Sequence, residues 1–281
     1  MNVWYALILG IFQGLTEFLP ISSSGHLVLL QKIFGITEPA LAFDTAVHVG
    51  TLLAVIAVLW RDIWNILRRI VQPLTLYLII ATIPTVIVAL LFKDQIEYAF
   101  SSGAFLGFAF LVTSALLLIS DRLYRGAGKS NGYPAKLDDP PKVRTQDEMN
   151  WIDAIVIGLL QAVAIIPGIS RSGATISGAL SRRLDRNFAA RFSFILSIPA
   201  ILGALVFQIK DLTKAGASGD GAIGSLPIVV GCLSAAIVGF LSIRLTLKIV
   251  REHSLWGFAL YTGILGLLVL VDKFGTHLFF I

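Results

Sequence analysis

The chain has 281 residues, of which 56% are hydrophobic and only 14% charged, and its net charge is +5. A soluble domain carries about 25% charged residues, so the composition indicates an integral membrane protein. Apolar and polar residues do not alternate with a period of two, which argues against a transmembrane β-barrel and leaves an all-α polytopic fold. The basic excess then points to lysine and arginine in cytoplasmic loops and to membrane lipids as neighbours, with no nucleic-acid partner.

The first apolar stretch, at residues 3–19, ends in Pro-Ile-Ser-Ser-Ser-Gly, and an apolar stretch of only about ten residues follows. Proline with small polar residues after it breaks a helix. The pattern predicts a helix–break–helix hairpin over residues 3–34 that enters and leaves the membrane on one side. Irregular backbone at that depth is tolerated only when it is buried in protein or lines a wet cavity.

Three apolar runs follow the hairpin, each near the roughly 20 residues that a helix needs to cross a bilayer, at 42–60, 74–92 and 103–120. We assign residues 1–122 to a first repeat and the polar residues 123–150 to a cytoplasmic linker. The order then recurs over residues 151–281. A second hairpin is predicted at 152–181, and three further spans are predicted at 192–209, 226–243 and 255–271.

The two hairpins align without a gap at an offset of 148 residues: GIFQGLTEFLPISSSG at 10–25 matches GLLQAVAIIPGISRSG at 158–173. Each hairpin precedes three spans, and because three is odd, the second copy is inserted upside down. The sequence thus predicts two inverted repeats. Inverted repeats with broken helices place their binding site near the bilayer midplane, where the repeats meet.

Cationic residues divide unevenly among the predicted loops. With the loops after the first, third and fifth spans and the mouth of the second hairpin in the cytoplasm, sixteen lysines and arginines lie inside and five outside. Such a bias sets the orientation of helical membrane proteins. It predicts that both termini and the mouth of the first hairpin face the outside.

The first break carries polar residues that are costly to bury in a membrane, which indicates that they have a function. Gln13 and Glu17 are four residues apart and share a helix face, as do Ser22 and His26 across the break. Serines at this position offer N-cap oxygens to the next helix. A carboxylate there needs a reason, which is either a bound divalent metal or a role as general base. Ser23 or His26 is the candidate nucleophile, with the other or Glu17 assisting.

The second break has the same serines but different charge. Arg171 stands where the first break has Ser23, whereas Glu17 and His26 correspond to Ile165 and Ala174. Two helix N-termini that meet inside a protein bind anions, above all phosphate, and a guanidinium adds a planar fork for phosphate oxygens. The predicted ligand is therefore anionic. Predicted binding residues on the two breaks are Gln13, Ser22, Ser24, Gly25, Ser170, Ser172, Gly173 and Thr175. Supporting roles are predicted for Asp44, His48 and Gln161.

At these residues the sequence resembles the undecaprenyl-pyrophosphate phosphatase family of the bacitracin-resistance type. The first family motif matches residues 13–26 and the second, Pro-Gly-x-Ser-Arg-Ser-Gly-Ala-Thr, matches residues 167–175. The acidic position in FDTAVHVGT matches Asp44. One position departs from the pattern: Gln13 stands where many members have a second glutamate, which leaves Glu17 as the main candidate metal ligand.

The resemblance implies hydrolysis of undecaprenyl pyrophosphate to the monophosphate carrier, which is used again in cell-wall synthesis, and resistance to bacitracin. It also implies a divalent cation, Mg²⁺ or Ca²⁺, and catalytic roles for Glu17, Ser23, His26 and Arg171. Ser23 is the first choice of nucleophile, His26 the second and a metal-bound water the third. The expected location is the bacterial cytoplasmic membrane, with an outward-facing site. The sequence does not decide whether the protein is a monomer or a homodimer.

Other function classes remain to be weighed against this one. A polyprenyl-phosphate transporter or flippase would also use inverted repeats and an anion site, but transport alone does not require His26 with Ser23 and Glu17. Acid-phosphatase-type lipid phosphatases need an Arg-Pro segment, which this chain does not contain. A purely structural membrane protein would not explain why the two breaks differ.

Overall fold

A computed structural model of the chain describes residues 1–36, 41–103, 105–126, 143–215 and 224–278. Over these residues the fold is all-α: twelve α-helices, a 3-10 turn η1 (Gln146–Glu148), a π-helical turn η2 (Asp272–Thr276), and no β-strand. The predicted all-α polytopic class is confirmed. Most of the predicted linker lies outside the described residues.

The helices before and after the linker follow one order: a broken hairpin, then long apolar helices. The first set is α1 (Val3–Phe18), α2 (Ser23–Ile33), α3 (Leu41–Val58), α4 (Trp60–Arg68), α5 (Pro73–Leu91), α6 (Lys93–Ser102) and α7 (Leu106–Gly126). The second set is α8 (Trp151–Val163), α9 (Arg171–Ser181), α10 (Arg186–Ala215), α11 (Ser225–Glu252) and α12 (Trp256–Val271).

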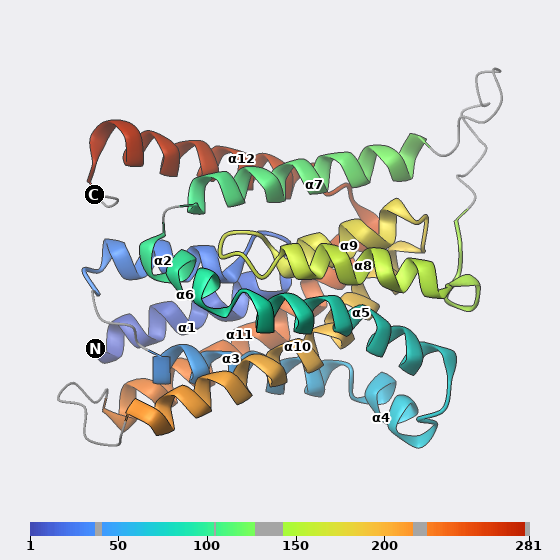
Figure 1. Cartoon of the computed structure of the whole chain (residues 1–281), viewed down its shortest axis with the longest axis horizontal. Helices are drawn as coiled ribbons and strands as arrows, with labels where there is room; N and C mark the ends of the chain where they lie inside the picture. The colour runs from blue at the N-terminus through green and yellow to red at the C-terminus, as the bar shows by residue number, and fades with distance from the viewer. Residues whose placement is uncertain (37–40, 104, 127–142, 216–223, 279–281) are drawn as a thin grey trace.

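The two hairpins open toward opposite ends of the molecule. In Figure 1, α1 and α2 occupy the left part of the molecule with the N-terminus at its edge, and α8 and α9 extend to the right. Their breaks lie between these ends. Asn2 caps α1 and Asn150 caps α8 with side-chain oxygens, so each hairpin begins at a polar residue and continues as an apolar helix.

Each hairpin packs against a long helix of the other repeat. Helix α1 lies on α11, where a Cβ on Gly10 would come within 2.5 Å of the Gly231 carbonyl oxygen. Helix α8 lies on α5 in the same way, since a Cβ on Gly158 would come within 2.5 Å of the Ala81 carbonyl oxygen. Gly10 and Gly158 hold equivalent positions in the repeat. Close approach at small residues is how helices associate in lipid.

Five described helices are long and apolar enough to cross a bilayer, and the pair α3 and α4 makes six if it counts as one span. That pair bends by 77° at Leu59, so the predicted run at 42–60 stops spanning at Val58. The sequence did not predict the short helices α4 and α6, which connect the first three spans. Helices α10 and α11, with 30 and 28 residues, are longer than the runs predicted for them, because polar turns extend the apolar cores.

Buried ion pairs tie the helices together at the end where the second hairpin opens. Asp153 is fully buried and accepts hydrogen bonds from Arg144 (3.0 and 2.8 Å) and Arg182 (2.7 Å). Asp121 pairs with Arg186 on α10 at 2.5 Å. These contacts connect α8 with α9 and α7 with α10 at this end of the molecule, and so hold the second hairpin and its neighbours in place.

Candidate active site at the paired helix breaks

The two helix breaks touch one another. The Gly168 backbone N–H donates to the Ser24 hydroxyl across the interface at 3.4 Å, and the Ser172 hydroxyl donates to the Leu19 carbonyl at 3.0 Å. Each break thus binds the other through a serine near the start of its second helix. The helices α2 and α9 begin at this junction, and so bring their free N-terminal N–H groups close together.

Both second helices are capped by the serine that the repeat places there. The Ser22 hydroxyl accepts from the Gly25 N–H at 3.3 Å, and the Ser170 hydroxyl accepts from the Gly173 N–H at 3.1 Å. The backbones nevertheless differ. Ser22 has a φ of 73°, which is rare for a residue with a side chain, while Ser170 has a φ of −70°. A left-handed residue that is not glycine costs about 1–3 kcal/mol and is typical of functional sites.

The second break is instead turned by a glycine and held by a threonine. Gly168 has a φ of 94°, and a Cβ there would lie 2.7 Å from the Ala109 side chain. The buried Thr113 hydroxyl donates to the Gly168 carbonyl at 3.2 Å and accepts from the Ser170 N–H at 2.9 Å. Helix α7 therefore anchors the second break from outside the hairpin.

Glu17 is the centre of the polar cluster. Its Oε2 accepts hydrogen bonds from the Gln13 amide at 2.9 Å and from the Ser23 hydroxyl, and its Oε1 accepts from the Arg171 guanidinium. Glu17 is 6% exposed, so this ion pair joins the two breaks in a nearly water-free setting. The structure thus brings together three of the four predicted catalytic residues.

The cluster is buried on one side and open on the other. Gln13 and Glu17 are buried, whereas Ser23, Ser24 and Arg171 are half-buried and so form the accessible edge. Two buried atoms of the cluster have no hydrogen-bond partner: the Oε1 of Gln13 and the Nη1 of Arg171. Buried polar atoms without partners are costly and uncommon, so this acceptor and this donor mark the cluster as a candidate binding site.

His26, the fourth predicted catalytic residue, contacts neither Ser23 nor Glu17 through a hydrogen bond. Its Nδ1 lies 2.6 Å from the Ser22 carbonyl, which can only accept, so Nδ1 carries the proton. In the neutral ring Nε2 is then an acceptor, and it takes the Tyr261 hydroxyl of α12 at 2.7 Å. The two rings are stacked at 5.7 Å. Both ring nitrogens are therefore engaged.

Sequence reasoning missed Tyr261, because it lies 235 residues from His26 and belongs to no motif. Thr113 was missed for the same reason. Each lies beside a second polar residue in its helix, Thr262 and Ser114, so no local signal singled it out. In Figure 1 α7 and α12 run side by side along one edge of the molecule, and their close packing carries both residues toward the breaks.

The predicted supporting residues each have hydrogen-bond partners of their own. Asp44 accepts from the Gln31 amide at 3.0 Å, which ties α3 to the first hairpin. His48 Nδ1 donates to the Asp44 carbonyl at 2.6 Å, within α3. Gln161 donates to the Thr85 hydroxyl at 3.0 Å and so points into the α5–α8 contact.

The binding residue at the far end of the second motif faces away from the junction. The buried Thr175 hydroxyl lies 2.5 Å from the Ser193 hydroxyl and 2.9 Å from the Arg171 carbonyl. It thus ties the first turn of α9, which carries Arg171, to α10. This contact positions Arg171 and offers no free donor to a ligand.

The donor set around Glu17 fits a hard divalent cation only in part. The described residues contain no group of three or more His, Cys, Asp or Glu side chains that would hold a metal. The oxygens present are the Glu17 carboxylate, the Ser23 hydroxyl and the unpartnered Gln13 Oε1. Mg²⁺ is often held by one or two carboxylates and completed by substrate phosphates, so these residues fit such an ion when a phosphate supplies the remaining ligands.

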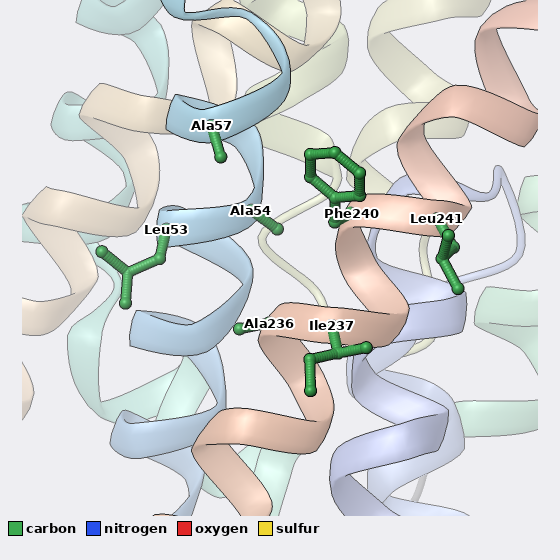
Figure 2. Close-up of a pocket in the computed structure, with 7 residues that line it drawn as sticks. All are labelled: Leu53, Ala54, Ala57, Ala236, Ile237, Phe240 and Leu241. Carbon is green, nitrogen blue, oxygen red and sulfur yellow. The ribbon is translucent and has the colours of Figure 1, made fainter.

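An apolar groove of about 360 Å³ lies between α3 and α11 (Figure 2). It contains no residue of the polar cluster and is lined by Leu53, Ala54, Ala57, Ala236, Ile237, Phe240 and Leu241. Its Ala54 lies near the ring of Phe18, because a Cβ on Gly239 would be 3.2 Å from the Ala54 side chain and 3.4 Å from that ring. Phe18 directly follows Glu17.

Comparison with known families identifies one that matches this chain. The model of the bacitracin resistance protein BacA matches residues 6–268, which include both breaks and every span except the last residues of α12. The chain belongs to that family.

Relatives of this BacA-family chain match it along nearly the whole length. The undecaprenyl-diphosphatase of Carboxydothermus hydrogenoformans is 44% identical over 96% of this chain and 97% of its own. Undecaprenyl-diphosphatase 4 of Bacillus cereus is 42% identical over 98% of both chains. The undecaprenyl-diphosphatase of Methanosphaera stadtmanae is 38% identical over 96% of this chain and 98% of its own.

Proposed function

We propose that this chain is a membrane phosphatase that hydrolyses undecaprenyl pyrophosphate to undecaprenyl phosphate and inorganic phosphate. One observation carries the proposal: Glu17 binds a serine of its own hairpin and an arginine of the other, at a junction of two helix N-termini. The names of the relatives support the same substrate. The activity would return the lipid carrier to cell-wall synthesis, and would confer resistance to bacitracin.

The pyrophosphate is held at the accessible edge of the cluster. Helix N-termini attract phosphate through their free N–H groups, and α2 and α9 both begin there. The unpartnered Nη1 of Arg171 faces no protein acceptor and is the natural donor to a phosphate oxygen. Because Nη2 of the same group binds Glu17, one guanidinium fixes both the substrate and the carboxylate.

Ser23 is the nucleophile of this proposal and Glu17 its base. The Ser23 oxygen attacks the terminal phosphorus, and the bond from that phosphorus to the bridging oxygen breaks. The serine proton passes to Glu17, to which it is already hydrogen-bonded, and then to the departing lipid phosphate. Water then attacks the phosphorus of the phosphoserine, and the bond from that phosphorus to the Ser23 oxygen breaks. Glu17 takes a proton from the water and returns it to the Ser23 oxygen, so that inorganic phosphate leaves and the Ser23 hydroxyl is restored.

His26 has a positioning role in this mechanism. Its Nε2 is bonded to Tyr261 and its Nδ1 to the Ser22 carbonyl, so neither nitrogen is free to attack phosphorus in this arrangement. The Nδ1 bond instead fixes Ser22 in its left-handed conformation, which sets the start of α2 and the place of Ser23.

A divalent cation, Mg²⁺ or Ca²⁺, would be held by Glu17 and Gln13 together with the substrate phosphates. When bound, it supplies positive charge that polarises the phosphoryl oxygens and offsets the charge of the carboxylate. The unpartnered Gln13 Oε1 supports this assignment, since an amide oxygen is a suitable ligand for either ion.

The prenyl tail lies along apolar surfaces open to lipid, and the α3–α11 groove beside Phe18 is such a surface. The cluster opens, on this proposal, to the outer face of the bacterial cytoplasmic membrane. A cysteine replacing Glu97 on α6 should react with an impermeant maleimide on intact cells in a Cys232→Ser background. A cysteine replacing Asp147 should react only after permeabilisation. The reverse pattern would place the mouth of the first hairpin inside.

The decisive experiment measures phosphate release from undecaprenyl pyrophosphate by the purified protein in detergent, with Mg²⁺ or with a chelator. We expect release that needs the protein and stops in the chelator. Transport needs two compartments, whereas hydrolysis does not. A protein that releases no phosphate in detergent but moves polyprenyl phosphate across a vesicle bilayer would be a flippase, for which the opposed hairpins also provide the architecture.

A further inference from the structure

Helix α4 lies across the end of the molecule where the second hairpin opens. It follows α3 after a 77° bend, and none of its residues is buried. In Figure 1 it occupies the lower right edge of the molecule. If α3 spans the bilayer, α4, bent by 77° from it, runs close to the membrane plane.

The helix has an apolar and a polar face, as an interfacial helix requires. Trp60, Ile63, Trp64 and Leu67 form one stripe at helical spacing, and Ile63 packs against the core. Trp60 and Trp64 are about half exposed, at 55% and 48%. Tryptophan on one face and arginine on the other is the pattern of helices that lie in the boundary between head groups and acyl chains.

The polar face carries cations without carboxylate partners. Arg61, Arg68 and Arg69 are exposed, and none of them makes an ion pair with a described residue. The acid of α4, Asp62, is paired with Arg191 of α10 and so does not neutralise them. Arg61 and Arg68 lie over the rings of Trp60 and Trp64, with centroid distances of 5.6 and 5.0 Å. The arginines are therefore held at the depth of the indoles.

The corner after α4 adds polar atoms that lack partners. Helix α5 begins at Pro73, and next to its start the Nε2 of Gln72 and the Oγ1 of Thr75 are buried without a hydrogen bond. An amide N–H₂ and a hydroxyl can both donate to a phosphate. The first turn of α5 also has free backbone N–H groups that favour an anion.

We propose that α4 and the start of α5 form a binding site for the head groups of anionic phospholipids in the leaflet at this end of the protein. The indoles enter the acyl-chain boundary, and Arg61, Arg68 and Arg69 contact the lipid phosphates. The site lies at the opposite end from the mouth of the first hairpin. It anchors the bend between α3 and α5 and takes no part in the proposed hydrolysis.

Native mass spectrometry of the detergent-purified protein tests the site, with phosphatidylglycerol and phosphatidylcholine of identical acyl chains as probes. We expect phosphatidylglycerol to bind more tightly to the wild-type protein. A basic residue at a membrane surface contributes about 1 kcal/mol, or about fivefold, to attraction for anionic lipid. The triple variant Arg61→Gln/Arg68→Gln/Arg69→Gln should therefore lose most of the preference, while the corresponding three lysine substitutions should keep it.

The matched control removes three cations from the end of α11 on the same side: Arg244→Gln/Lys248→Gln/Arg251→Gln. We expect this variant to keep the preference for phosphatidylglycerol. An equal loss in the control would show a bulk charge effect and overturn the proposal, as would a wild-type protein that binds the two lipids alike. Because α4 contributes no buried residue, melting temperatures in phosphatidylcholine should be unchanged, so lost binding does not reflect unfolding.

Discussion

The two helix breaks start from the same sequence pattern and end with different contents. Both cap their second helix with a serine. A hydrogen bond also runs in each direction across the junction, from Gly168 N–H to the Ser24 hydroxyl and from the Ser172 hydroxyl to the Leu19 carbonyl. The first break contains a carboxylate, a serine hydroxyl and an imidazole, and its backbone strain falls on Ser22. The second contains a guanidinium, and its left-handed residue is Gly168.

The difference suggests a division of roles, in which the first break supplies the reacting groups and the second positions them. In the second break, Thr113 binds Gly168 and Ser170, and Thr175 binds Ser193, so its polar groups are mostly satisfied inside the protein. In the first, the Ser23 hydroxyl lies beside Glu17, whereas an amide oxygen without a partner occurs in both hairpins, on Gln13 and on Gln161. Substitutions in and beside the two breaks should therefore have unequal effects, and four of them test this in order of expected size.

The largest effect is expected for Glu17→Gln. The amide keeps the size and can still accept from Arg171, but it cannot take a proton from Ser23. General-base catalysis contributes about 10²–10⁴-fold, so turnover should fall by about that factor, and the dependence on Mg²⁺ should flatten. The measurement is steady-state phosphate release against Mg²⁺ concentration. The control is Ile165→Gln at the equivalent position of the second hairpin. Wild-type turnover in Glu17→Gln would make the carboxylate structural.

Arg171→Lys tests whether the second break holds the phosphate or merely neutralises Glu17. Lysine keeps the charge but loses the fork that binds Glu17 with one nitrogen and leaves the other free. Loss of one preorganised donor costs about 10²–10³-fold in turnover. Phosphate release at saturating substrate, with a melting curve, measures both properties.

The matched control for that substitution is Arg182→Lys, at the other end of α9, where the guanidinium pairs with buried Asp153. We expect it to leave turnover within a few-fold of wild type. If Arg171→Lys were equally mild, Arg171 would serve only as a counter-charge. If it did not fold, the residue would hold the repeats together.

A smaller effect is expected for Tyr261→Phe. The ring can still stack on His26, but the hydrogen bond to Nε2 is lost. One such bond is worth about 1 kcal/mol, so kcat should fall by about fivefold. KM should not change, because Tyr261 has no assigned contact with substrate. The control is Tyr5→Phe. Tyr5 lies in α1 and its ring stacks on that of Phe34. A rise in turnover would mean that Tyr261 restrains a catalytically free His26.

The smallest effect is expected for Gln161→Leu, when it is compared with Gln13→Leu at the equivalent position. Gln161 contacts Thr85 in the α5–α8 interface, away from Glu17. We expect unchanged turnover and a stability change of about 1 kcal/mol, read from the melting temperature. Gln13→Leu removes a donor to Glu17 and should raise the Mg²⁺ concentration needed for half-maximal activity. Equal effects on activity would refute the division between the breaks.

The sequence by itself determined the class of fold and the place of the cluster. Apolar runs near the length of a bilayer span and a proline before small polar residues act locally, so they can be read from neighbouring residues. The serine caps follow from the same local rule. Repetition at an offset of 148 residues then implied that the breaks are related, and the contrast of Glu17 with Arg171 implied different roles.

Tertiary packing alone decided which polar groups pair. Tyr261 reaches His26 only because α12 packs along α7, and Thr113 reaches Gly168 only because α7 lies against α9. His26, four residues after Ser22, was predicted to assist Ser23 or to be the second-choice nucleophile. The bond from Nδ1 to the Ser22 carbonyl turns its other nitrogen toward α12. Such contacts join residues 55 to 235 positions apart. They depend on helix crossing and side-chain direction, which no local pattern encodes.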